Sequence, residues 1–117
     1  MQVLLTGFEP FGGETINPSW EVVRCLPEEQ ISGIMLSKRR LPAVFGKAIE
    51  EIIKAVRELK PDVVIAVGQA GGRASISVER VAINLDDTDV ADNDNNLPQD
   101  SPIVQEGPAA YFSTVPI

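Results

Sequence analysis

The chain has 117 residues, of which 17 are acidic and 10 are basic, and its formal net charge is −7. This length corresponds to one small domain or to part of one. Histidine is absent and there is a single cysteine, so the chain alone offers no imidazole base, no internal disulfide and no zinc site built from these residues.

The charge balance and the hydropathy pattern argue against two classes of partner. A net charge of −7 disfavours a nucleic-acid surface, which needs clustered Lys and Arg. No apolar run approaches the ~20 residues of a membrane-spanning helix. The N-terminal residues lack the basic region of a signal peptide, which favours a cytoplasmic protein. We therefore expect no nucleic-acid partner and no membrane partner.

The first part of the chain predicts a strand, a helix and a second strand. Residues 2–6 form a short apolar run that is typical of a buried strand. Asn17 followed by Pro18 is typical of a helix start, with Asn as the N-cap and Pro at the first helical position. This helix is predicted to end near Leu26, and residues 31–41 alternate loosely as in a strand.

The middle of the chain continues the same alternation. Residues 43–60 carry apolar side chains at steps of three and four, which predicts an amphipathic helix that ends before Pro61. The β-branched run 62–67 suits a strand buried on both faces, and residues 78–85 predict one more strand. This order predicts an α/β fold, a three-layer sandwich with a central mostly parallel sheet flanked by helices.

Residues 86–102 are predicted to form a long polar acidic loop. They include six Asp and three Asn, and the run from Asp92 to Asn96 resembles the start of a calcium-binding EF-hand loop. The sixth and twelfth positions would then be Leu97 and Ile103, where such a loop requires Gly and Glu. We expect no metal ion and no cofactor.

Two glycine-rich loops follow predicted parallel strands, at 7–13 and 68–73. The first has the spacing of a phosphate-binding loop, but Gly13 and Glu14 stand where Lys and Ser or Thr are required. Because ligands bind outside the carboxyl ends of the strands in such sheets, the Phe pair of the first loop could clamp a small flat group. The alternative is that both Phe side chains plug the end of the sheet. In the second loop, Gln69 offers a donor and an acceptor suited to an amide.

Two further side chains leave open interpretations. Glu79 lies in an apolar setting, where a carboxylate is either exposed and paired with Arg or buried for a purpose. Cys25 falls near the end of the first predicted helix, where the helix dipole disfavours a thiolate. We expect Cys25 to be a small buried hydrophobe.

Four segments of the chain, in this order and spacing, resemble pyroglutamyl peptidase I (pyrrolidone-carboxylate peptidase), a family of cytoplasmic cysteine peptidases. The segments are 5–13 with Asn17-Pro18, 67–73, 79–84 and 108–114. The resemblance spans essentially the whole chain. It implies an α/β sandwich with a mixed sheet, peptides with N-terminal pyroglutamate as substrates, and a homo-oligomer (dimer or tetramer).

The resemblance also implies roles for individual residues. Catalysis in the family is acyl transfer by a Cys nucleophile, a His base and a Glu that orients the His. Glu79 takes the position of this Glu. Phe8 and Phe11 match aromatic residues that hold the pyroglutamyl ring, and Asn17 and Gln69 match polar residues of the substrate site.

The chain also departs from the family pattern. Family members are nearly twice as long, their catalytic Cys and His lie beyond Ile117, and Cys25 does not match the nucleophile. Asp89 stands where the family has an Arg linked to activity. We therefore expect the chain alone to be inactive, and to oligomerise or be marginally stable through uncovered sheet and core. Two hypotheses remain: the N-terminal portion of a single peptidase domain, and a non-catalytic remnant that binds a ligand or oligomerises.

Overall fold

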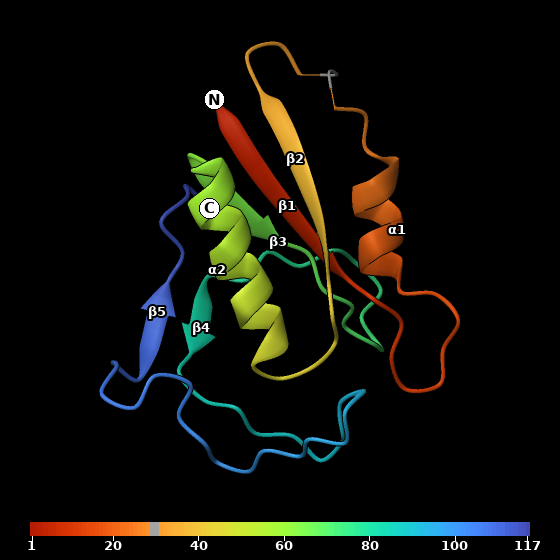
Figure 1. The fold of residues 1–117 in the computed structure, drawn as a ribbon, viewed down its shortest axis with the longest axis vertical. Coiled ribbons are helices and arrows are strands. Elements are labelled where there is room, and N and C mark those ends of the chain that lie inside the picture. The colour runs from red at the N-terminus through yellow and green to blue at the C-terminus, as the bar shows by residue number, and fades with distance from the viewer. Residues whose placement is uncertain (29–30) are drawn as a thin grey trace.

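The computed structural model describes residues 1–28 and 31–117. Two helices accompany a three-stranded parallel sheet of order β2-β1-β3, and a small two-stranded sheet lies beside it (Figure 1). The elements are β1 Gln2–Phe8, α1 Pro18–Cys25, β2 Met35–Leu41, α2 Lys47–Leu59, β3 Val63–Ala66, β4 Val81–Ile83 and β5 Ala110–Phe112. The predicted α/β class with a mostly parallel sheet is confirmed.

The strand β1 is the centre of the core because it pairs with a neighbour on each side. Val3 and Leu5 pack with Val23 of α1 in one cluster. Side chains alternate along a strand, so the fully buried Leu4 and Thr6 point to the other face. Right-handed crossovers to opposite sides of β1 place α1 and α2 on opposite faces of the sheet. Figure 1 shows α2 in front of β1 and β3.

The start of α1 matches the sequence prediction. Asn17 is the N-cap, its Oδ1 accepts a hydrogen bond from the backbone N–H of Ser19 at 3.0 Å, and Pro18 is the first helical residue. The helix ends at Cys25, whose thiol is exposed. The expectation of a buried Cys25 is therefore wrong, because the last turn of this short helix extends past the sheet-facing Val23.

The helix α2 begins four residues later than the apolar periodicity predicts, at Lys47 instead of residue 43. Gly46 takes φ 81° at its N-cap, so residues 43–46 form a turn. The helix ends before Pro61, with Lys60 in the left-handed region and its N–H bonded to the carbonyl of Val56.

The strands also differ in extent from the prediction. β1 runs two residues further, because Gly7 and Phe8 still pair with β2. β2 begins at Met35; residues 29–30 lie outside the described part, and residues 31–34 turn through a bond from the N–H of Ile34 to the carbonyl of Ile31. The last predicted strand, 78–85, shrinks to β4, which pairs antiparallel with β5 instead of joining the parallel sheet.

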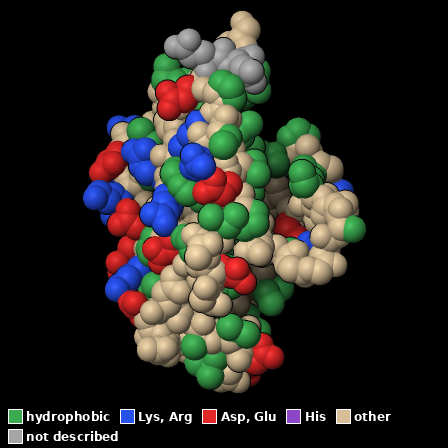
Figure 2. Space-filling model, turned by 90° about the vertical axis from the view of Figure 1, so that its right-hand side faces the viewer, with side chains coloured by type: hydrophobic (Ala, Val, Ile, Leu, Met, Phe, Trp, Pro, Cys, Tyr) green, Lys and Arg blue, Asp and Glu red, His purple; other side chains and the backbone are tan. Residues whose placement is uncertain are grey.

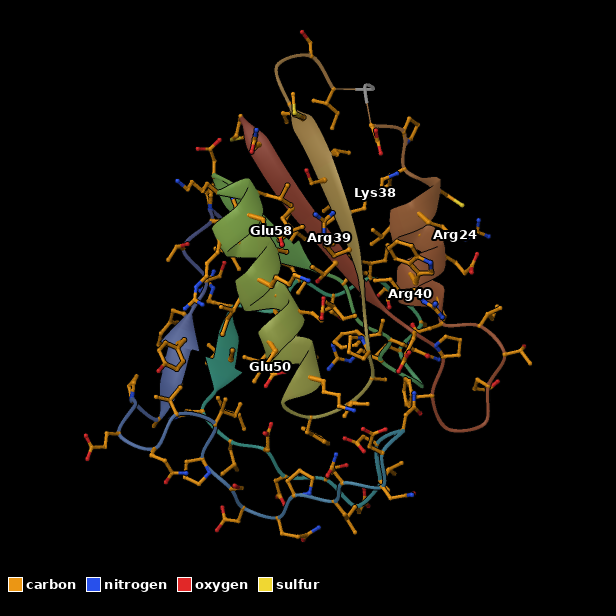
Figure 3. All side chains as sticks on the ribbon, in the orientation of Figure 1. Arg24, Lys38, Arg39, Arg40, Glu50 and Glu58 are labelled. Carbon is orange, nitrogen blue, oxygen red and sulfur yellow. The ribbon has the colours of Figure 1, made fainter. Side chains whose placement is uncertain are left out.

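Basic side chains do not gather into one patch. Along β2, Lys38 and Arg40 lie towards α1, whereas Arg39 lies between β2 and α2 (Figure 3). Lys38 Nζ donates to the carbonyls of Arg24 and Leu26 and so satisfies the end of α1. Figure 2 shows Lys and Arg interspersed with Asp and Glu over the face that carries α1.

Large apolar side chains are exposed along β3, β4, β5 and the segment before β4. Ile76 is 99% exposed, Val78 70% and Phe112 67%, and Val64 and Ile65 of β3 are also exposed. Many exposed apolar side chains on neighbouring elements are typical of a face that another polypeptide covers. No helix in the described ranges is both long and apolar enough to span a bilayer.

Candidate functional site

A cavity of about 490 Å³ opens at the carboxyl ends of β1, β2 and β3. Parallel strands bring the loops that follow them to one edge of the sheet, which is where α/β proteins bind ligands. The walls are mostly apolar with a few polar groups, the usual composition of a small-molecule site. The residues lining it include Phe8, Phe11, Asn17, Val44, Phe45, Ile49, Gly68, Gln69, Asp86, Thr88, Val90 and Asp92.

Phe8 and Phe11 both line this cavity, at the end of β1 and in the loop after it. Phe8 is half-buried and its backbone N–H donates to Ser19 Oγ at 2.9 Å. Phe11 is 39% exposed, so it does not plug the sheet end as a buried core residue would. Of the two interpretations of the Phe pair, the geometry favours a wall that faces a ligand space.

Asn17 lines the cavity but uses its side chain mainly to fix the loop. It is 2% exposed. Its Oδ1 accepts from both the backbone N–H and the hydroxyl of Ser19, and its Nδ2 donates to the carbonyl of Glu9 at 3.1 Å. Asn17 therefore joins the start of α1 to the loop that carries Phe11.

Gln69 lies in the same cavity, directly after Gly68. Its side chain is exposed and makes no hydrogen bond within residues 1–28 and 31–117. Nothing lies within 4 Å of a Cβ built on Gly68, so backbone and ligand have room to approach. Gln69 thus offers a free amide NH2 group as donor and a free amide oxygen as acceptor at the cavity wall.

Two further walls of the cavity were missed by sequence reasoning. Phe45 comes from the turn before α2, and Val90 comes from the acidic loop. Phe45 could have been predicted from the sequence, because the turn that contains it follows a parallel strand and must reach the same edge of the sheet. Val90 could not, because no local pattern in residues 86–92 indicates where the loop folds back.

The acidic loop is held in place by Asp92. Its carboxylate accepts from the backbone N–H groups of Phe45, Asp94 and Asn96 at 2.7 to 2.9 Å, and from the side-chain amide of Asn96 at 2.9 Å. Burial raises the pKa of Asp92, but these donors outweigh it and hold the pKa below the ordinary value of 3.8. Lys47 Nζ contacts Asp94 at 2.6 Å, and this hydrogen bond raises the pKa of Lys47.

Glu79 lies outside this cavity. Its side chain is 70% exposed and its Oε1 accepts from Arg73 Nη1 at 2.7 Å, so the structure has the exposed, Arg-paired form of the two alternatives. It precedes β4 in a segment whose residues are all exposed. The other four predicted site residues share one cavity, and Glu79 does not join them.

Asp89 is exposed and is not among the cavity-lining residues, although its neighbours Thr88 and Val90 are. In the portion of the chain that the structure describes, no three Cys, Asp or Glu side chains lie close enough to hold a metal ion.

Comparisons of the sequence with a family model and with known proteins give the same family, and the matches cover essentially the whole chain. A sequence model of the family described as pyroglutamyl peptidase matches residues 1–117. The pyrrolidone-carboxylate peptidase of Klebsiella pneumoniae (strain 342) is 60% identical over 115 residues, which cover 98% of this chain and 54% of that protein.

Solved structures give the same result. The crystal structure of Bacillus amyloliquefaciens pyroglutamyl peptidase I has a TM-score of 0.94 at 47% identity, covering 98% of this chain and 56% of that one. The pyrrolidone carboxyl peptidase of the hyperthermophile Pyrococcus furiosus has a TM-score of 0.94 at 49% identity, covering 99% and 56%. The chain spans about half the length of these relatives.

Proposed function

The chain belongs to the pyroglutamyl peptidase family, and on that premise we propose that it supplies the ring pocket of a peptidase that removes N-terminal pyroglutamate. The cavity at the sheet edge is the observation that carries this proposal, because it brings Phe8, Phe11, Asn17 and Gln69 together. A lactam ring is small, flat and amide-bearing, so aromatic walls with a free side-chain amide suit it.

Within this pocket each residue has a distinct part. Phe8 and Phe11 contact the faces of the ring. Gln69 pairs its free amide with the lactam amide. Asn17 forms part of the wall, and its bonds to Ser19 and to the Glu9 carbonyl keep the Phe-bearing loop in place.

Glu79 is proposed to orient a catalytic histidine that this chain does not contain. The nucleophilic Cys and the His would come from the portion of the full-length relatives that this chain does not match. In the complete site the Glu79 carboxylate would accept a hydrogen bond from the imidazole. Arg73, which bonds to Glu79 in this structure, would then move partly aside. We also propose that the protein is cytoplasmic and that its reaction needs no cofactor.

The exposed apolar face formed by β3, β4 and β5 supports a further proposal, that the chain self-associates as a dimer or tetramer. Sedimentation at several protein concentrations tests it. Concentration-dependent association is expected, and a stable, monodisperse monomer would count against it.

The test of the function uses a hybrid protein. Residues 1–117 are joined to the portion of the Klebsiella relative that this chain does not match, and the hybrid is assayed with a fluorogenic pyroglutamyl amide. We expect turnover by the hybrid and none by the chain alone. A folded hybrid that stays inactive even with Asp89→Arg would contradict the proposal and favour the non-catalytic remnant.

The variant Asp89→Arg separates two causes of an inactive hybrid. Recovery of activity would locate the loss at Asp89, where a negative charge opposes negative charge that develops on the reacting carbonyl. No recovery would reject the ring-pocket function itself.

A further inference from the structure

Glu9 lies in a closed ring of hydrogen bonds that joins three loops around the cavity. Its Oε1 accepts from the backbone N–H of Ala43 at 3.0 Å and from Asn93 Nδ2 at 3.0 Å. The backbone N–H of Asn93 donates to the carbonyl of Ala43 at 3.2 Å and completes the ring. Asn93 Nδ2 also donates to the carbonyl of Pro10 at 3.0 Å.

Each member of this ring adjoins a different wall of the cavity. Glu9 lies in the chain between Phe8 and Phe11, Ala43 is itself a lining residue of the turn that contributes Phe45, and Asn93 follows the lining segment of the acidic loop. The two partners of Glu9 are 34 and 84 residues away in the chain. One carboxylate oxygen therefore ties the loop after β1 to the turn before α2 and to the acidic loop, two segments that Asp92 joins to each other.

We propose that Glu9 is a positioning residue that sets the width of the cavity for the pyroglutamyl ring; this inference rests on the proposed function for its link to substrate. Glu9 is half-buried and is not itself a lining residue, so it acts through the walls. Carbon atoms attract best at roughly 3.5–4.0 Å, and a gap of half an ångström to an ångström forfeits about a quarter to a half of that attraction. A ring held on both faces is therefore sensitive to any separation of the loops.

Glu9→Ala removes the acceptor of the Ala43 N–H and of one N–H of the Asn93 side-chain amide. We expect the loops to move apart as a result. In the hybrid, we expect KM for the pyroglutamyl amide to rise about tenfold or more, with kcat within about twofold, because the lost contact is uniform substrate binding. Glu9→Gln keeps an oxygen that accepts both bonds, so its KM stays near that of the parent.

Two outcomes would overturn the assignment. A kcat that falls while KM is unchanged would indicate loss of folded enzyme alone, and Glu9→Gln behaving like Glu9→Ala would show that the acceptor is not what matters. Glu58→Ala is the matched control, because it removes an exposed glutamate at the end of α2 away from the cavity (Figure 3) and should leave both constants unchanged.

A second measurement does not depend on activity. In the 117-residue chain, amide hydrogen exchange at Ala43 should become at least about tenfold faster in Glu9→Ala, through loss of its one acceptor, while Leu4 in β1 stays protected. Unchanged exchange at Ala43 would overturn the hydrogen-bond ring even if the hybrid were inactive. An inactive hybrid with faster Ala43 exchange would instead reject only the proposed function.

If Leu4 also loses protection in Glu9→Ala, that variant has destabilised the whole fold, and Asn93→Ala then tests the role of the hydrogen-bond ring. This variant removes the side-chain bonds of Asn93 to Glu9 and to the Pro10 carbonyl, and keeps the bond between Glu9 and Ala43. We expect KM to rise a few-fold with kcat unchanged, and an unchanged KM would overturn the role of the ring.

Discussion

The close approach of α1 to β1 makes Gly7 sensitive to a single added methyl group. A Cβ at Gly7 would lie 2.8 Å from the carbonyl carbon and oxygen of Ser19 and 2.8 Å from Cα of Trp20. These are backbone atoms, so no side-chain rotation relieves the contact, and α1 must move away from the sheet. Overpacking of a core costs roughly 1–3 kcal/mol and occasionally more. We expect Gly7→Ala to lower the free energy of unfolding by about 3 kcal/mol.

Denaturant unfolding followed by tryptophan fluorescence measures this loss, because the single Trp of the chain, Trp20, lies in α1 and packs against the core. Gly71→Ala is the matched control. Nothing lies within 4 Å of a Cβ at Gly71, and its φ is not positive, so the change should be neutral or stabilise by up to about 1 kcal/mol. Equal midpoints for Gly7→Ala and Gly71→Ala would refute the proposed packing of α1 on β1.

Four further changes test the core and the site. The Thr6 hydroxyl is buried with no hydrogen-bond partner in the described residues, so Thr6→Val should raise the unfolding free energy by up to about 1 kcal/mol, and a loss above that size would show a missed partner. In the hybrid, Phe8→Ala should raise KM about tenfold to a hundredfold, as steady-state kinetics would show, and an unchanged KM would remove Phe8 from the pocket. Because the pKa of Asp92 is lower in the folded state, its contribution to stability is complete above pH 3.8 and is lost as the pH falls below it. Asp92→Asn should therefore reduce the loss of stability between pH 7 and pH 3, and an identical pH profile would contradict this. Glu79→Gln in the hybrid should lower kcat roughly 10²–10⁴-fold with little change in KM, and full activity would exclude an orienting role.

The elements that the sequence predicted best are those whose signals are local. The N-cap of α1 followed from Asn17 and Pro18, because both act within one turn. The start of α2 did not, because Val44 and Phe45 continue the helical periodicity that Gly46 interrupts through its backbone conformation. β4 is shorter than its apolar run because its partner β5 offers only three residues for pairing.

The same division holds for the site. Phe8, Phe11 and Gln69 could be placed at one edge because the loops after parallel strands share it. The contribution of the acidic loop could not be predicted, since it depends on contacts such as that between Glu9 and Asn93, which are 84 residues apart. The pairing of Glu79 with Arg73 was one of two open alternatives, because sequence does not determine whether a carboxylate in an apolar run is covered.

The most direct test of the ring pocket is a crystal structure of the hybrid with L-pyroglutamate, the ring-bearing product of the proposed reaction. The lactam ring is predicted to lie in the cavity of about 490 Å³, with its faces against Phe8 and Phe11 and its amide bonded to Gln69. A ring bound elsewhere, for example in the second cavity of about 410 Å³ between β3 and residues 112–115, would contradict the account.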